Sequence, residues 1–259
     1  MAFEKKLISI VTPCYNEEAN VGEVYRQVKE VFQKLEKYNY EHVFIDNNSK
    51  DKTVQLLKEI AQKDKNVKII VNARNFGHIR SPYYALLQAK GDAVALLVAD
   101  LQDPPVLIND FINKWEQGNK IVIGVKKQSE ESFFMFQVRK LYYRTVNKLA
   151  ETELIKNFTG FGLYDQEIIN ILRKIDDPYP YFRGLICDIG FEKVQIEYVQ
   201  PARKRGITAN NFYTLYDLAM LGITNHSKVP LRLATMIGIA ASLFSFLIAL
   251  GYFIYKIIF

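Results

Sequence analysis

Cysteine is scarce in this sequence. Cys14 and Cys187 are the only two among 259 residues, and their spacing matches neither a metal-binding motif nor a disulfide framework. A disulfide-stapled secreted domain and a zinc module are therefore excluded, and both thiols are expected to be buried and free in a reducing compartment. A signal peptide is also excluded, because the N-terminal apolar run is short and lacks a small-residue cleavage site.

Charge is missing from one long stretch near the C-terminal end. Residues 233–255 form a run of 23 positions without a charged side chain. About 20 apolar residues span the core of a bilayer, and the glycines and serines in the run are common in membrane helices. We therefore expect a transmembrane helix within residues 229–259, with a buried core helix as the alternative.

The charges around this run predict its orientation. Basic residues precede it at 203–205, Lys228 and Arg232, whereas only Lys256 follows it. Positive charge is retained on the cytosolic side, so we expect a cytosolic N-terminal domain. Because the sequence stops at Phe259, a second membrane helix is expected to be missing after it.

Internal repeats and low-complexity linkers are absent, and 49% of the residues are hydrophobic, enough for one large core with an appendage. The formal net charge of +6 fits a nucleic-acid partner or an anionic membrane surface equally well. Composition alone leaves these two open.

Strand and helix patterns alternate over residues 1–125. Short apolar or β-branched runs indicate strands at 7–12, 42–45, 67–71, 93–99 and 121–125. Helical spacing falls between them, at 21–35, at 54–60 after a Ser49 cap, at 82–89 before Gly91, and at 107–115. This alternation predicts a Rossmann-like α/β domain with a mostly parallel sheet and flanking helices.

The strand at 93–99 runs directly into the polar tract Asp100-Leu101-Gln102-Asp103-Pro104-Pro105. Ligands of open α/β sheets bind at the carboxyl ends of the strands. A carboxylate and an amide two residues apart suit a hard divalent cation that takes its other ligands from a phosphate. Asp103 precedes two prolines and is expected to cap a helix first and to serve function second.

Two amphipathic segments follow the α/β region. Residues 127–150 interleave aromatic and basic side chains, which fits a membrane-surface helix or a core helix with a basic edge. Residues 207–228 place apolar side chains on one face and lead into the charge-free run, which favours an interfacial helix. The expected domains are a catalytic domain at 1–206, a juxtamembrane helix at 207–228 and a membrane segment at 229–259.

Four stretches occur in one order along the chain. They are Thr12-Pro13-Cys14-Tyr15-Asn16-Glu17-Glu18, Ile45-Asp46-Asn47-Asn48-Ser49-Lys50-Asp51-Lys52-Thr53, Arg74-Asn75-Phe76-Gly77-His78 and the tract at 98–105. Together the series resembles the GT-A type glycosyltransferases of family 2. The similarity is to the branch that loads sugars onto polyprenyl phosphates, which includes dolichyl-phosphate mannose synthases and undecaprenyl-phosphate glucosyltransferases.

The resemblance implies roles for particular residues. Asp100 and Gln102 would hold Mg2+ or Mn2+, with Asp100 essential for catalysis. The nucleotide would be bound by residues of the first three motifs, namely Pro13, Tyr15, Asn16, Glu17, Asp46 and Asn75, together with Asp100. Arg203 and Arg205 would clamp phosphates and Arg139 the lipid phosphate, although attraction to anionic headgroups explains these arginines too. Ser49 and Asp51 are expected to be caps, and Gly77 to serve backbone geometry.

The chain departs from the family pattern at several positions. Val98 stands where the family has its first metal-side acid, and Asn47 replaces an aspartate. Gly160 and Gly162 occupy the acidic and arginine positions of a "D-F-R-L" segment, and Ala209 replaces a lysine. These departures leave Asp100 and Gln102 as the two expected ligands from the tract.

The implied function is transfer of a sugar from a nucleotide-sugar, UDP rather than GDP, to polyprenyl phosphate at the cytosolic face of the inner membrane. The expected partners are these substrates and membrane lipids, without nucleic acid, in a homotetramer. One alternative acceptor is a glycan or protein hydroxyl, which would require a base such as Asp165 or Asp188. Another alternative is a non-catalytic protein that binds nucleotide-sugar.

Overall fold

The computed structural model describes residues 5–127, 155–175, 177–201, 216–217, 220–221, 224 and 227–259. The chain divides into two compact units, residues 1–132 with 155–210 and residues 133–154 with 211–259. Arg139, Arg203, Arg205 and Ala209 lie outside the described residues, as do nearly all of the expected helix at 127–150 and most of 207–228.

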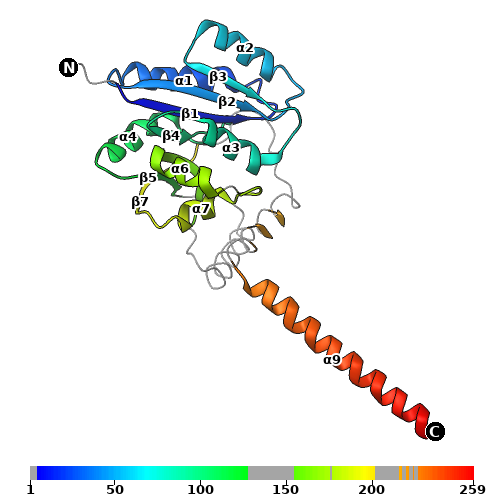
Figure 1. Cartoon of the computed structure of the whole chain (residues 1–259). Coiled ribbons are helices and arrows are strands. Elements are labelled where there is room, and N and C mark those ends of the chain that lie inside the picture. The colour runs from blue at the N-terminus through cyan, green and yellow to red at the C-terminus, as the bar shows by residue number, and fades with distance from the viewer. Residues whose placement is uncertain are drawn as a thin grey trace. The chain divides into compact units, whose positions relative to one another are not determined.

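The first unit alternates strands and helices along most of its length (Figure 1). Its strands are β1 (Leu7–Cys14), β2 (Asn39–Asp46), β3 (Val67–Val71), β4 (Ala93–Leu96), β5 (Ile121–Lys126), β6 (Phe158–Asp165) and β7 (Lys193–Tyr198). Its helices are α1 (Val21–Gln33), α2 (Thr53–Lys63), α3 (Gly77–Gln88), the 3-10 turn η1 (Pro105–Leu107), α4 (Ile108–Glu116), α6 (Gln166–Ile175) and α7 (Phe182–Asp188).

The seven strands form one sheet in the order β3-β2-β1-β4-β6-β5-β7. The pairs β3–β2, β2–β1, β1–β4 and β5–β7 are parallel. β6 is antiparallel to both β4 and β5, with Leu96 opposite Gly162. The expected mostly parallel sheet is confirmed, and β6 adds an inserted antiparallel strand that the sequence pattern did not reveal.

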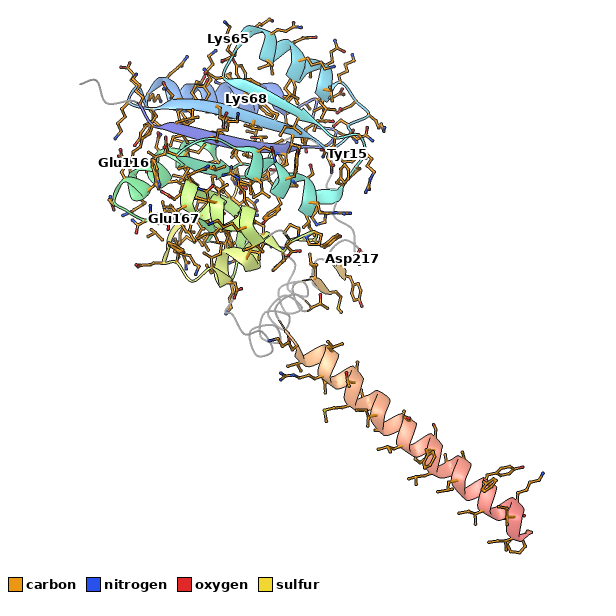
Figure 2. All side chains as sticks on the ribbon, viewed as in Figure 1. Tyr15, Lys65, Lys68, Glu116, Glu167 and Asp217 are labelled. Carbon is orange, nitrogen blue, oxygen red and sulfur yellow. The ribbon has the colours of Figure 1, made fainter. Side chains whose placement is uncertain are left out.

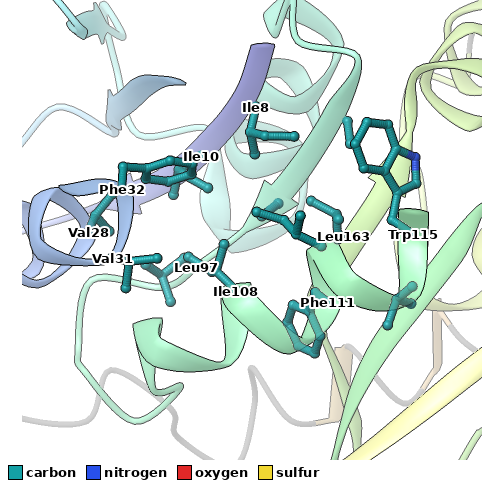
Figure 3. Close-up of a cluster of buried hydrophobic side chains, with 14 of the residues drawn as sticks. Ile8, Ile10, Val28, Val31, Phe32, Leu97, Ile108, Phe111, Trp115 and Leu163 are labelled. Atoms are coloured by element: carbon teal, nitrogen blue, oxygen red, sulfur yellow. The ribbon is translucent and has the colours of Figure 1, made fainter. Parts of the chain in front are cut away.

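Apolar side chains fill both faces of the sheet. On one face α1 and α4 pack on β1, β4 and β6, where Ile8, Val28, Phe32, Phe111 and Leu163 meet (Figure 3). The other face is covered by α3, α6 and α7. Because the central strands are buried on both sides, they read as continuous apolar runs rather than alternating ones.

Several expected boundaries were wrong. β4 ends at Leu96 rather than Ala99, because the chain leaves the sheet after Leu97 N donates to Val11 O and begins to turn. α3 begins at Gly77 and carries Pro82 inside it, so its first turn consists of residues that the apolar spacing did not mark. Gly91 lies beyond the end of α3, where a Cβ would come within 2.7 Å of Ser9 N.

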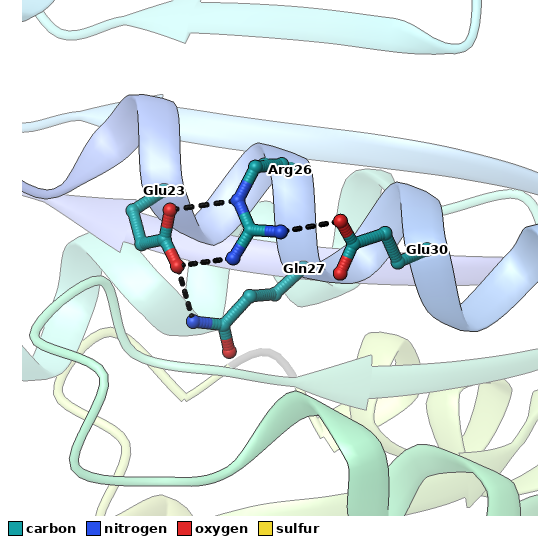
Figure 4. Close-up of polar contacts among 4 residues, drawn as sticks. All are labelled: Glu23, Arg26, Gln27 and Glu30. Carbon is teal, nitrogen blue, oxygen red and sulfur yellow. Dashed lines mark hydrogen bonds and ion pairs between the residues drawn. The ribbon is translucent and has the colours of Figure 1, made fainter.

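The outer face of α1 is a solvated charge network (Figure 4). Arg26 lies between Glu23 and Glu30, and its Nε is 2.8 Å from Glu23 Oε2. Gln27 Nε2 adds a 2.7 Å bond to Glu23 Oε1. Arg26 is more than half exposed, and such pairs stabilise a helix by only a few tenths of a kcal/mol. This arginine therefore offers a surface position where charge can be removed at little cost.

The second unit ends in the 30-residue helix α9 (Val229–Ile258). Residues Leu231–Ile258 are long and apolar enough to cross a membrane, and none of that stretch is buried inside the protein. This exposure favours the expected membrane span over the alternative of a buried core helix. The exposed apolar surface extends over nearly the whole helix, which is typical of a segment solvated by lipid.

A buried histidine makes the stability of the sheet depend on pH. His42 of β2 is fully buried, its Nε2 is 2.9 Å from Thr12 Oγ1, and its Nδ1 has no hydrogen-bond partner among the described residues. Burial lowers the pKa of His42 from 6.5 to about 3. Between these two pH values the ring is protonated in the unfolded chain and neutral in the folded chain. The contribution of His42 to the free energy of unfolding is fully present above the pKa of the unfolded chain. It falls by about 1.4 kcal/mol for each pH unit below that value.

We therefore expect unfolding at pH 5 to require about 2 kcal/mol less than at pH 7, as measured by denaturant titration of the full chain in detergent. In His42→Gln, which lacks the titrating ring, this part of the pH dependence should disappear. Equal slopes in the two proteins would show that another group is responsible.

Candidate functional site

The candidate site is formed by loops at the carboxyl ends of β1, β2, β3 and β4. The parallel register places Cys14 beside Asp46 and Asp46 beside Val71, so the segments that follow these strands emerge on one edge. Tyr15, the first residue after β1, lies at this edge, and Glu116 lies at the opposite one (Figure 2). The first three sequence motifs are thus brought together as expected for ligands of an open α/β sheet.

Backbone-to-side-chain bonds join the first two loops. Asn16 N donates to Ser49 Oγ at 2.8 Å, and Lys50 N donates back to Asn16 Oδ1 at 2.8 Å. Glu17 N donates to Thr53 Oγ1 at 2.8 Å, while Glu17 Oε2 accepts from Asn20 Nδ2 at 2.6 Å. These bonds hold both loops rigid with the sheet before any ligand arrives.

Asp46 has a structural partner in its own loop. Its buried carboxylate accepts from Ser49 N at 2.9 Å and from the Ser49 hydroxyl. The sequence predicted that Ser49 caps α2, and this was wrong, because the helix starts only at Thr53. Asp51 does serve the start of α2, since its Oδ1 accepts from Thr53 N at 3.0 Å.

Asn47 connects the second loop to the third. Its Nδ2 donates to Asn75 Oδ1 at 2.8 Å, and its Oδ1 accepts from Phe76 N at 2.9 Å. An aspartate could not donate the first of these bonds. The departure from the family pattern thus gives the turn before α3 an extra bond, and Gly77 ends that turn with a φ of +83°.

Strained backbone is concentrated in these loops. Asn16, Asn48 and Leu101 have φ values of 56°, 66° and 58°. The left-handed region costs a residue with a Cβ roughly 1–2 kcal/mol, and asparagine tolerates it better than leucine does. Leu101 lies between Asp100 and Gln102, so the strain coincides with the tract that the sequence marked for metal binding.

The Asp100–Gln102 tract fits a divalent cation with two protein ligands. Both side chains are half-buried, and Asp100 Oδ1 accepts from Gln102 N at 3.1 Å. Over the described ranges, no group of three or more His, Cys, Asp or Glu side chains could hold a metal ion. A cation here would take its remaining ligands from a phosphate and water, as Mg2+ commonly does. Val98, also half-buried, adds no oxygen.

Asp103 is not a helix cap, contrary to expectation. No side chain caps η1 or α4, and the buried Asp103 carboxylate accepts a hydrogen bond from the hydroxyl of Tyr198 instead. Burial raises the pKa of Asp103 to about 6, an effect that the Tyr198 hydrogen bond opposes. Tyr198 lies 95 positions away in β7, and no local pattern could have revealed the pairing.

Replacing Tyr198 with phenylalanine should lower the unfolding free energy by about 1–3 kcal/mol at pH 7, because the buried Asp103 carboxylate loses its donor. Denaturant titration of the full chain would measure this. The double variant Tyr198→Phe with Asp103→Asn should recover part of the loss, since a neutral amide needs less compensation. An unchanged Tyr198→Phe stability would mean that the hydrogen bond contributes nothing net.

The other sequence-predicted nucleotide residues lie at the same edge. Pro13 is the second-last residue of β1, and Tyr15 is 41% exposed. Asn75 is exposed on the turn before α3. Their contact with a nucleotide stays a prediction, which their shared position supports.

Gly160 and Gly162 are explained by packing within β6. A Cβ on Gly162 would lie 2.5 Å from Val122 O and 3.2 Å from the Tyr164 hydroxyl. That hydroxyl donates to Gly160 O at 2.6 Å, and Gly160 has a φ of +101°. Gly162 therefore has no room for a side chain, and at Gly160 the positive φ would strain any residue with a Cβ.

The carboxylates suggested as a base for a hydroxyl acceptor lie elsewhere. Asp165 is opposite Ala93, at the amino end of β4, where it accepts from Trp115 Nε1 at 2.7 Å and pairs with Lys120. It also caps α6 through Glu167 N at 2.9 Å. Asp188 ends α7, six residues beyond the start of that helix. Asp165 is thus at the wrong edge, and neither residue belongs to the loops of the site.

Sequence comparison shows similarity to sugar transferases. Residues 9–172 match the family described as glycosyl transferase family 2. An uncharacterized glycosyltransferase, YkcC of Bacillus subtilis, is 37% identical over 235 residues, which cover 90% of this chain and 72% of that protein. The bactoprenol glucosyl transferase of Shigella phage SfV is 33% identical over 241 residues, covering 93% of this chain and 78% of the relative.

Solved structures share the fold. Glucosyl-3-phosphoglycerate synthase from Mycobacterium tuberculosis, in complex with Mn2+, UDP and phosphoglyceric acid, has a TM-score of 0.58 at 16% identity and covers 84% of this chain and 76% of its own. The mannosyltransferase PcManGT from Pyrobaculum calidifontis, in complex with GDP-Man and Mn2+, has a TM-score of 0.55 at 18% identity. The match covers 79% of this chain and 59% of the mannosyltransferase chain. The sheet and its helices are therefore of the GT-A type.

Proposed function

This chain belongs to glycosyl transferase family 2, and from that premise we propose that it transfers a sugar from a nucleotide-sugar to a polyprenyl phosphate. The observation that supports polyprenyl phosphate as the acceptor is the 33% identity to a bactoprenol glucosyl transferase over nearly the whole chain. The apolar helix α9 supports it, because a membrane-bound enzyme can meet a lipid substrate in the bilayer.

The donor is proposed to be a UDP-sugar bound with Mg2+ or Mn2+. Structural neighbours of the same fold contain UDP or GDP-Man with Mn2+, and one contains UDP with Mg2+. Asp100 and Gln102 would hold the cation, whose chemistry is to offset the charge on the departing diphosphate. The bonded loops at Asn16, Ser49 and Asn75 would orient the nucleotide without reorganising.

The acceptor needs no strong base on the protein. A phosphate oxygen is already ionised near neutral pH, whereas a hydroxyl must lose a proton as it attacks. The position of Asp165 at the opposite edge of the sheet counts against its service as the base of the hydroxyl-acceptor alternative. The phosphate attacks the anomeric carbon, the bond to the nucleoside diphosphate breaks, and the diphosphate takes up the bonding electrons.

The proposed location is the cytosolic face of the inner membrane, held by α9, with Arg203, Arg205 and Arg139 as candidate contacts to phosphates. A homotetramer is proposed from the family resemblance alone, and light scattering of the detergent-solubilised chain would test it.

The deciding experiment is to incubate membranes containing the full chain with undecaprenyl phosphate and a panel of nucleotide-sugars. We expect a lipid-linked sugar that forms with Mg2+ or Mn2+ and is lost when a chelator removes the cation. A protein that binds UDP but makes no product from any donor would instead support the non-catalytic alternative.

A further inference from the structure

Two arginines beside the site have cationic groups that no carboxylate of the described residues balances. Arg80 of α3 and Arg183 of α7 form no ion pair in the described part of the chain, whereas Arg26 lies between two glutamates. Arg80 Nε is shielded from solvent and has no hydrogen-bond partner. Among the described residues, Arg183 Nη1 donates one long bond, 3.4 Å, to Phe158 O. Half-buried cations with free donors are costly unless an anion completes them.

Aromatic rings hold both guanidinium groups in place. The Cζ of Arg80 lies 5.1 Å from the ring centre of Tyr179, and that of Arg183 lies 5.3 Å from the ring centre of Tyr181. Both tyrosines belong to the short segment between α6 and α7. Cation–π contacts of this kind limit the positions that the guanidinium groups adopt, so the groups lose less freedom when they bind a ligand.

A ring contact between α3 and α7 places the two arginines on elements that touch each other. The ring centres of Tyr83 and Phe182 are 6.3 Å apart, and Tyr83 lies one turn after Arg80 on α3. His78, at the start of α3, is close enough to Arg183 for that charge to lower its pKa in addition to the larger effect of burial. We call Arg80, Arg183 and His78 the basic cluster.

The basic cluster lies on the same sheet edge as the Asp100 tract. β6 runs antiparallel to β4 with Gly162 opposite Leu96, so Phe158, which accepts from Arg183, lies beyond the carboxyl end of β4. α3 starts directly after the Asn75 turn, which Asn47 ties to the second loop. The cluster therefore borders the site from the side of α3 and α7.

We infer that the basic cluster binds the phosphate group of the polyprenyl phosphate acceptor, an inference that rests on the proposed function. The donor diphosphate would have its own charge partner in the cation proposed at Asp100 and Gln102, so a second anionic group would require a second set of donors. Guanidinium groups match phosphate oxygens in geometry as well as charge. A phosphate held here would lie at the border of the donor site with its charge balanced, and its lipid chain would stay free to leave the domain.

The test uses the detergent-solubilised full chain and two probes, farnesyl phosphate for the acceptor and UDP with Mn2+ for the donor, each titrated by calorimetry. Arg80→Gln and Arg183→Gln should each weaken farnesyl phosphate binding by about 10- to 100-fold, as expected for the loss of one charge-assisted hydrogen bond. Affinity for UDP should stay within about twofold, which also shows that the variants are folded. Arg26→Gln removes one positive charge from the solvated face of α1 and should leave both affinities unchanged.

Lysine variants and a neutral lipid sharpen the result. Arg80→Lys and Arg183→Lys keep the charge but lose the planar fork, and they should recover part of the lost affinity. Farnesol lacks the phosphate, and its binding should be equally weak in all the proteins. The inference is overturned if wild-type protein does not bind farnesyl phosphate, if the double glutamine variant binds it unchanged, or if farnesol shows the same losses.

The same titrations separate donor from acceptor and binding from catalysis. Weakened UDP binding with intact farnesyl phosphate binding would assign the cluster to the donor diphosphate and overturn the acceptor assignment. The proposed function fails instead if wild-type protein makes no lipid-linked sugar, a result that turnover assays give independently of these affinities. Where turnover is seen, the glutamine variants should raise KM for polyprenyl phosphate and leave KM for the nucleotide-sugar unchanged.

Discussion

Replacing Asp100 with alanine should reduce sugar transfer by at least about a thousandfold. Asp100 supplies the one carboxylate of the candidate metal tract, and without it Gln102 alone would have to hold the cation. Removing a group that stabilises charge developing in the transition state typically costs about a hundred- to a thousandfold, and a weakly held cation adds to that loss. The measurement is the initial rate of lipid-linked sugar formation at saturating donor, acceptor and Mn2+.

The matched control is Asp110→Ala, which removes an exposed carboxylate from the first turn of α4. It should retain nearly full activity. Asp100→Ala should keep the thermal midpoint of the wild-type protein, because in the described part of the chain its carboxylate accepts only the local bond from Gln102 N. A rate close to wild type in Asp100→Ala would refute the metal assignment.

Restoring the arginine of the family pattern at Gly162 should destabilise the domain by about 5 kcal/mol or more. The new Cβ would lie 2.5 Å from Val122 O in a central strand, and backbone there cannot move aside cheaply. Overpacking a core costs about 1–3 kcal/mol, and an unpaired buried charge about 3–5 kcal/mol. A loss of this size approaches the whole stability of a typical domain, so we expect poor yield and a lowered denaturation midpoint.

Gly22→Ala is the control for the change from glycine. Gly22 lies in the first turn of α1, and apart from its chain neighbours and its own helix no atom of the described residues lies within 4 Å of the position that its Cβ would take. Alanine there should raise stability by about 0.5 kcal/mol, because it restricts the unfolded chain. A Gly162→Arg protein that unfolds like wild type would show that β5 and β6 can separate to admit a side chain.

The parts of the fold that depend on local pattern were predictable from sequence. Apolar runs marked the parallel strands, and the polar motifs after them identified the sheet edge where Asp46 and Asp100 lie. Motif order was enough to identify the family, because each loop of the site is a continuous stretch that starts where a strand ends.

The parts that depend on distant partners were not predictable. Asp103 looked like a cap because two prolines follow it, yet its partner is Tyr198 in the last strand. The helices that carry Arg80 and Arg183 touch through the rings of Tyr83 and Phe182, which are distant in the sequence. Asp165 was a candidate base because it lies close in sequence to the family's acidic position. β6 runs antiparallel to β4, however, so Asp165 lies at the sheet edge opposite the site.

The insertion of β6 between β4 and β5 has a consequence for the order in which the chain can fold. β4 and β5 do not pair with each other in the described sheet, because β6 lies between them. Both strands therefore lack this neighbour until β6, which begins more than 30 residues after β5 ends, has been synthesised. Such long-range pairing is slow, because a loop must close before any contact is made. The apolar edge of β4 therefore stays open until residue 165 has been made. A nascent chain interrupted before that point would expose the unpaired edge of β4, which could pair with strands of other chains and aggregate.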